Sequence, residues 1–218
     1  MRRAPAAIAG ALLACACTAQ VPQAAEQQPE PATLARAAAE DCLSRRAEGD
    51  PAAVEALRAA LENATAPGRV EQVATVAGEQ PARVVDRAQV LDSQVERAIA
   101  ARSRALEATT TDQLVVVTVP DLGGLSIEEF GLALGNSWGI GRADFDNGVL
   151  LLVAPRERRV RVEVGCGLEA VLTDARAAAI VDKMTPLFLK GQFERGVELG
   201  FGEVETLLRA RPERQYGL

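Results

Sequence analysis

Two continuous apolar runs constrain the fold of this chain more than any other feature of its sequence. Leu114–Val119 and Gly148–Val153 consist almost entirely of Val and Leu. A strand with one face in water alternates polar and apolar side chains, whereas a strand covered on both faces reads as a continuous apolar run. We therefore expect two buried central strands in a sheet that carries helices on its faces.

A third strand is predicted at Arg159–Val164, where polar and apolar residues alternate. The link of residues 154–158 is too short for the crossover that parallel neighbours need, so this strand should form an antiparallel hairpin with Gly148–Val153. The fold class is therefore α/β with a small mixed sheet. Apolar residues at helical spacing predict helices at about 92–108, 126–138, 173–189 and 193–208.

The first residues predict export. Met1-Arg2-Arg3 followed by apolar residues 6–14 is typical of a signal peptide. The apolar run is shorter than the roughly 20 residues of a spanning helix. Leu12-Leu13-Ala14-Cys15 resembles the lipobox of bacterial lipoproteins, in which the cysteine receives the lipid. Lipidation of Cys17 is one alternative. The other is that both cysteines are merely small residues of a signal peptide that is removed.

These features predict a membrane-anchored lipoprotein on the periplasmic side of a bacterial envelope, built from four parts. A signal peptide or lipobox at 1–17 precedes a tether at 18–32 that is rich in Pro, Gln and Glu. A helical arm is expected at 33–68, broken at Gly49-Asp50-Pro51, and a folded domain at 83–210. Residues 69–82 show no clear pattern.

Charge and composition exclude several classes of function. The chain carries 24 Lys and Arg against 30 Asp and Glu, a net charge of −6, so we expect no nucleic-acid partner. It contains 0 histidines, which rules out Ser-His-Asp and Cys-His catalysis and His-based zinc sites. The remaining carboxylate and amide oxygens suit Ca²⁺ or Mg²⁺.

Gly165-Cys166-Gly167 follows the third strand and superficially fits a dinucleotide fingerprint. That fingerprint needs a helix that leads to another parallel strand, and no such strand is predicted here, so we expect no dinucleotide. Close packing explains the two glycines better.

Six blocks of sequence resemble the TPM domain family in its order and spacing. They are Val85–Leu91, Leu114–Gly124, Asn136–Gly141, Asp146–Ala154, Arg158–Glu169 and Leu172–Ala177. The resemblance implies a Rossmann-like three-layer α/β/α sandwich on the outer side of a membrane. It also implies a bound divalent cation, Ca²⁺ more than Mg²⁺, and acid phosphatase activity as found in some relatives.

The candidate metal ligands are the oxygen-bearing residues of these blocks, provided that they meet at one edge of the sheet. They are Asp86, Asp144, Asp146, Asn147 and Asp174, of which Asp86 and Asp146 are also candidate catalytic residues. Structural roles stay open as alternatives. Asp146-Asn147-Gly148 is a favoured turn sequence, and Asp86 and Asp174 are suited to helix or turn capping.

Cys166 stands where the family usually has an aromatic residue. Without a histidine base it is not expected to be a nucleophile. In an oxidising envelope Cys42 and Cys166 are expected to form a disulfide that ties the arm to the domain.

The sequence therefore predicts a TPM-domain protein that binds a Ca²⁺-like cation and acts in envelope maintenance by contacting an unidentified envelope protein. The alternative function is a metal-assisted acid phosphatase on small phosphomonoesters.

Overall fold

The computed structural model of the chain describes residues 59, 62, 67–77, 82–142 and 144–210. The predicted signal peptide and tether, most of the predicted arm, and Cys15, Cys17 and Cys42 lie outside the described residues. Within the described ranges, none of the helices combines the length and the apolar character needed to cross a membrane.

The described chain alternates helices and strands. The helices are α3 (Pro67–Ala77), α4 (Ser93–Thr110), α5 (Ile127–Trp138), α6 (Asp174–Phe188) and α7 (Phe193–Arg209), with a 3₁₀ turn, η1, at Cys166–Leu168. The strands are β1 (Val84–Asp86), β2 (Gln113–Thr118), β3 (Gly148–Ala154) and β4 (Arg159–Val164). The central strands and the four helices expected after residue 92 are therefore confirmed.

The strands form one sheet in the order β1-β2-β3-β4. β1 runs parallel to β2, and β2 runs parallel to β3 with Leu114 opposite Val149. β4 is antiparallel to β3, with Leu151 opposite Val162, so the predicted hairpin is confirmed. The sheet is mixed and open, and β1 and β4 are its edge strands.

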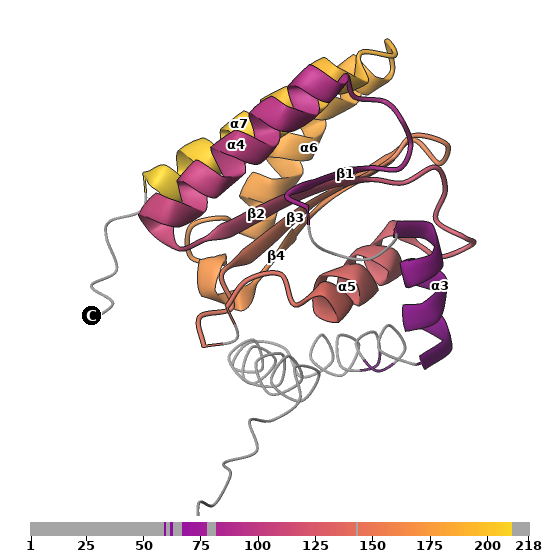
Figure 1. Cartoon of the computed structure of the whole chain (residues 1–218), viewed down its shortest axis with the longest axis horizontal. Coiled ribbons are helices and arrows are strands. Elements are labelled where there is room, and N and C mark those ends of the chain that lie inside the picture. Colours follow the sequence, from indigo (N-terminus) through magenta and orange to yellow (C-terminus); the bar gives the residue numbers. More distant parts are fainter. Residues whose placement is uncertain (1–58, 60–61, 63–66, 78–81, 143, 211–218) are drawn as a thin grey trace, which may run out of the picture.

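Helices cover both faces of this sheet (Figure 1). One apolar core includes Ile99 of α4, Met184 of α6 and Phe201 of α7, packed on Leu151 and other residues of the strands. A second core on the opposite face joins Val73 of α3 and Phe130 of α5 to β2 and β3. The result is the expected three-layer α/β/α sandwich.

Capping residues set the helix starts. Asp92 accepts a hydrogen bond from the backbone N–H of Gln94 before α4, and Thr173 accepts one from Arg176 before α6. Ser126 and Glu129 form a reciprocal capping box at the start of α5. Gly139 ends α5 in a left-handed conformation with a φ of 58°, which glycine adopts without a steric penalty.

Two described elements were not predicted. α3 falls mostly in residues 69–82, which show no clear apolar pattern in the sequence, and its buried residue Val73 joins the core beside α5. β1 was not predicted as a strand. Its three residues are too few to show a period of two, and its pairing to β2 becomes visible only in the folded sheet.

Candidate functional site

The predicted ligands divide between two opposite edges of the sheet. Asp86 ends β1, at the carboxyl edge of the parallel strands. Asp144, Asp146 and Asn147 precede β3, at the amino edge. β4 runs antiparallel and returns the chain to that amino edge, from which Asp174 opens α6. The expectation that all five residues share one rim is wrong. In parallel strands all carboxyl ends lie at one edge and all amino ends at the other, so Asp86, which ends β1, is separated from the residues that precede β3.

The Asp86 carboxylate organises the loop between β1 and α4. Its Oδ1 accepts a hydrogen bond from the backbone N–H of Val90 (3.2 Å), and its Oδ2 accepts one from Leu91 (2.9 Å). The hydroxyl of Thr118, at the end of β2, donates to Oδ1 as well. The turn and capping role that the sequence left open therefore describes Asp86 in the structure.

Asp146 joins the loop before β3 to the turn after β4. Its backbone is left-handed, with a φ of 44°. The carboxylate accepts a hydrogen bond from the backbone N–H of Cys166 (2.8 Å), and the Asp146 carbonyl accepts one from Gly167 (2.9 Å). A Cβ on Gly165 or Gly167 would overlap the carbonyl oxygens of Asp146 and Phe145, which confirms close packing as the reason for these glycines.

Asn147 is fully buried at the same edge. Its Oδ1 accepts a hydrogen bond from the backbone N–H of Arg142 (2.9 Å). Its Nδ2 donates to the carbonyl of Thr111 (2.8 Å) and lies 3.3 Å from Oδ1 of Asp112. Asn147 thus ties the turn between α4 and β2 to the loop that enters β3.

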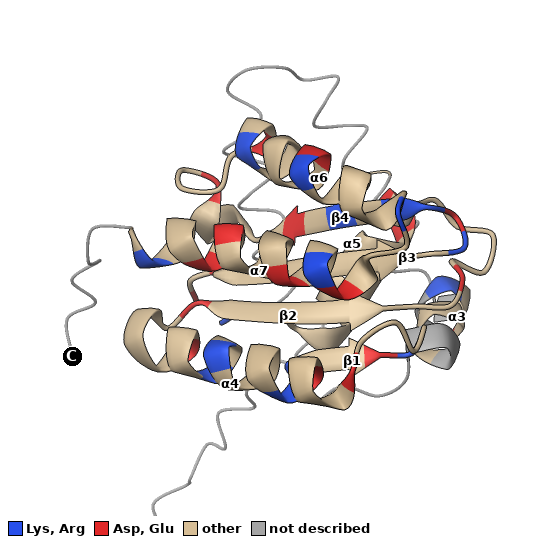
Figure 2. Cartoon of the chain, turned by 90° about the horizontal axis from the view of Figure 1, so that it is seen from above, with Lys and Arg blue, Asp and Glu red and all other residues tan. Residues whose placement is uncertain are grey.

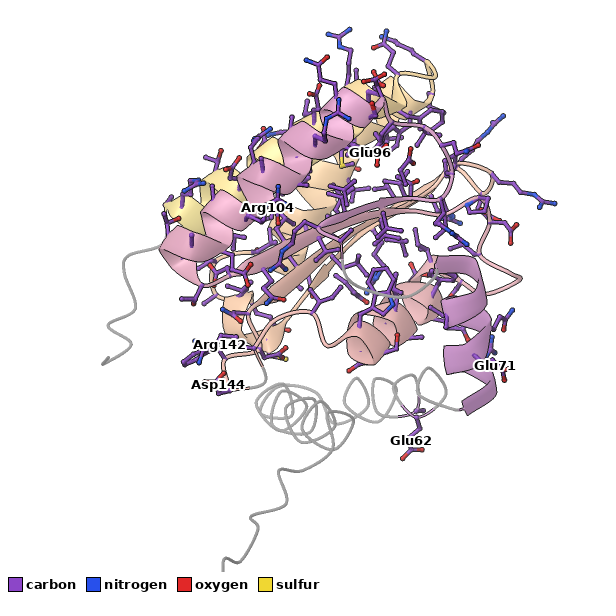
Figure 3. The ribbon with its side chains drawn as sticks, in the orientation of Figure 1. Glu62, Glu71, Glu96, Arg104, Arg142 and Asp144 are labelled. Atoms are coloured by element: carbon purple, nitrogen blue, oxygen red, sulfur yellow. The ribbon has the colours of Figure 1, made fainter. Side chains whose placement is uncertain are left out.

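Asp144 and Asp174 are exposed. Asp144 forms an ion pair with Arg142 through Nη2 (2.9 Å), and both side chains are about half exposed. Figure 3 shows this pair together, far from Glu96 at the other end of the molecule. Asp174 occupies the first turn of α6, after the Thr173 cap.

The predicted donors do not fit one shared cation site. The oxygens of Asp86, Asp146 and Asn147 accept hydrogen bonds from protein groups, and the five residues lie at two edges. The residues that the structure describes contain no group of three or more Cys, Asp or Glu side chains arranged to hold a metal ion.

A different set of carboxylates gathers at the carboxyl edge, where β1 ends and α4 begins (Figure 2). Burial raises the pKa of Glu96, Asp86 raises it further, Arg97 opposes the shift, and Asp92 adds to it. The backbone N–H of Asp92 donates to Oε1 of Glu194, which brings the start of α7 to the same place (2.6 Å). These groups make the edge acidic without assembling a metal site.

A groove of about 690 Å³ runs along the outer side of β1. Residues 82–84 line one side of it, and α4 lines the other with Glu96, Arg97, Ala100, Arg104 and Glu107. Glu107 forms an ion pair with Arg83 and accepts a hydrogen bond from Gln113 (2.9 Å). Within the described part of the chain, neither Arg97 nor Arg104 has a hydrogen-bonded or ion-pair partner, although Arg97 interacts electrostatically with the neighbouring Glu96.

The sequence-based interpretation missed this groove. The sequence contains only part of its signal, because Arg97 has no acidic residue three or four positions away, where a helical ion pair would form, whereas Arg104 has Glu107 three positions on. The other wall of the groove depends on β1, which was not recognised as a strand.

Cys166 is disulfide-bonded. Because Cys42 lies outside the described residues, its pairing with Cys166 stays a prediction.

Replacing Asn147 by alanine should destabilise the protein by about 3 kcal/mol, because a fully buried side chain is removed and two partly buried backbone groups, the Arg142 N–H and the Thr111 carbonyl, lose their partner. Urea denaturation measures the change. If Asn147 is structural, the loss is the same in EDTA and in millimolar Ca²⁺. The control Asp144→Ala, which removes an exposed ion pair, should cost less than about 1 kcal/mol. A loss for Asn147→Ala that appears only with Ca²⁺ would restore the cation-ligand interpretation.

Replacing Glu96 by glutamine should stabilise the protein near neutral pH, because the folded protein disfavours the charged carboxylate. A raised pKa means that the folded state holds the proton more tightly, so this contribution to stability is present below pH 4.5 and is lost as the pH rises above it. The gain in Tm should therefore shrink as the pH falls toward 4.5. Glu198→Gln on α7 is the matched control, and a gain that is constant with pH would contradict the prediction.

Comparisons with known proteins agree with this architecture. The family model of the TPM domain matches residues 84–207. A solution NMR structure of the N-terminal domain of a protein from P. gingivalis is 32% identical, covers 64% of this chain and 87% of its own, and superposes with a TM-score of 0.54. The corresponding domain of a Corynebacterium glutamicum protein is 19% identical, over 60% of this chain and 85% of its own, with a TM-score of 0.47. The search of curated proteins finds no match. The chain belongs to the TPM domain family.

Proposed function

We propose that this chain is an exported, lipid-anchored TPM domain that acts in the cell envelope by binding another protein. The lipid is placed on Cys15, with Cys17 as the alternative, and the tether at 18–32 would hold the domain away from the membrane surface. The basic and apolar residues at the start of the sequence support export.

The groove beside β1 is the observation that carries the protein-binding part of the proposal. Pockets for small molecules are concave and mostly apolar, with a few converging polar groups. This groove is instead open and elongated: it follows the side of α4 from Glu96 to Glu107, and half of the residues that line it are Arg or Glu. A shape of this kind suits a segment of a partner chain better than a small phosphomonoester.

The acid phosphatase alternative has weaker support. Its candidate catalytic residues, Asp86 and Asp146, lie at opposite edges of the sheet, and each carboxylate accepts hydrogen bonds from backbone N–H groups. A single Ca²⁺ site formed by all five predicted residues also lacks support, because these residues lie at two edges of the sheet. Binding of a divalent cation elsewhere stays a prediction, and it is outside this proposal.

Photocrosslinking in cells tests the proposal. A photoreactive amino acid at Ala82, which lines the groove, is expected to capture a specific envelope protein. The same amino acid at exposed Ala179 of α6, on a different part of the surface, is the matched control and should capture none. The absence of any product from Ala82 would overturn the proposal.

Hydrolysis of a chromogenic phosphomonoester by wild type but not by Asp86→Asn would favour the phosphatase instead.

Membrane fractionation tests the anchor. Wild type is expected in the membrane fraction, and a chain carrying both Cys15→Ser and Cys17→Ser in the soluble fraction, because a covalent lipid supplies most of the affinity for the bilayer. The single substitutions assign the lipid to one cysteine. A doubly substituted chain that stays in the membrane would contradict lipid anchoring.

A further inference from the structure

We infer that the groove beside β1 docks an extended, acidic peptide segment, which adds to the sheet as a further strand and places carboxylates against Arg97 and Arg104. This inference rests on the proposed protein-binding function and names the chemistry of the partner. Three features of the described chain support it: an open strand edge, a groove of matching length, and two arginines without a hydrogen-bonded or ion-pair partner.

The open edge is the outer side of β1. The carbonyl of Arg83 accepts a hydrogen bond from Val116 (3.0 Å), and the N–H of Arg87 donates to Thr118 (2.9 Å). In a parallel pair, alternate residues direct their backbone groups to the same neighbour. The N–H and C=O groups of Val84 and Asp86 therefore point away from β2, toward the groove side.

The groove has the length of a short strand. Glu96 and Glu107 both line it, and their separation of eleven helical steps on α4 corresponds to about 16 Å at about 1.5 Å per residue. An extended segment of about five residues spans that length at about 3.3 Å per residue. Val84 and Ala100 provide small apolar surfaces beside it.

The charges define which segment fits. Glu107 holds Arg83 in an ion pair, so Arg83 is already neutralised. Arg97 and Arg104 remain as exposed cations on the groove side of α4, and Figure 3 shows Arg104 well along the helix from Glu96. The carboxylates of Asp86, Asp92 and Glu96 make the opposite end unfavourable for an anion. Because Arg97 lies next to Glu96, the acidic residue of the peptide that meets Arg104 should contribute more to binding than the one that meets Arg97.

Strand addition accounts for the site better than capture of a small anion. A small anion would use only the two arginines and would leave the open backbone groups of β1 in water. An added strand bonds to those groups through its main chain and gains selectivity from its side chains. Because β1 is short, main-chain bonds alone are few, so charge should decide which segments bind.

A displayed library of short random peptides, selected on the full chain purified from membranes in detergent, tests the inference. Enriched peptides should contain Asp or Glu among β-branched residues. The double substitution Arg97→Glu/Arg104→Glu should weaken their binding by at least about tenfold, as measured by fluorescence anisotropy. The matched control is Arg159→Glu, an exposed arginine on β4 at the far edge of the sheet, which should leave binding unchanged.

A second control separates strand addition from charge attraction. N-methylation of alternate backbone nitrogens keeps the side chains of a selected peptide but removes its ladder hydrogen bonds, and it should abolish binding in one of the two registers. The inference is overturned if no peptide is enriched, if the enriched peptides are not acidic, if the arginine substitutions have no effect, or if N-methylation is tolerated in both registers.

Crosslinking from Ala82 in the Arg97→Glu/Arg104→Glu background distinguishes this inference from the proposed function. Loss of the captured protein supports the acidic-strand site. Capture that persists at wild-type level would leave the protein-binding function standing and would refute the acidic-strand site.

Discussion

Burial of β2 and β3 on both faces is the constraint on which the rest of the structure depends. Leu114 and Val116 face one apolar core while Val115 and Val117 face the other, so neither side of the strand tolerates water. Helices must therefore cover both faces. That requirement places α4, α6 and α7 on one side and α3 and α5 on the other. Among the residues that the structure describes, no strand pairs with the outer edges of β1 and β4.

The sequence predicted those elements whose patterns are local. Continuous apolar runs identified β2 and β3, the short link 154–158 identified the hairpin, and helical spacing identified α4 to α7. β1 was not predicted, because three residues are too few to show an alternation of polar and apolar side chains. Its strand character also depends on hydrogen bonds to Val116 and Thr118, which lie far along the chain. α3 was not predicted because residues 69–82 show no clear apolar period in the sequence.

The candidate site was predicted less well, for a geometric reason and a chemical one. Once β1 and β3 are known to be parallel, Asp86 after the first and Asp146 before the second must lie at opposite edges. Sequence also does not reveal where a carboxylate or amide oxygen points. In the fold, Asp86 accepts hydrogen bonds from the backbone N–H groups of Val90 and Leu91, and Asn147 accepts one from that of Arg142. Side-chain oxygens that the sequence suggested as metal ligands therefore bind backbone N–H groups instead.

The edge strand that pattern analysis missed is the place where this fold exposes backbone groups. Exposed edges invite indiscriminate pairing, and proteins limit it by keeping edge strands short and flanking them with charges. β1 has both features, since it is three residues long and lies between Arg83 and Arg87. The same features favour selective binding. With few main-chain bonds available, a segment gains enough affinity only if its side chains complement the arginines of α4, so protection from aggregation and choice of partner follow from one arrangement.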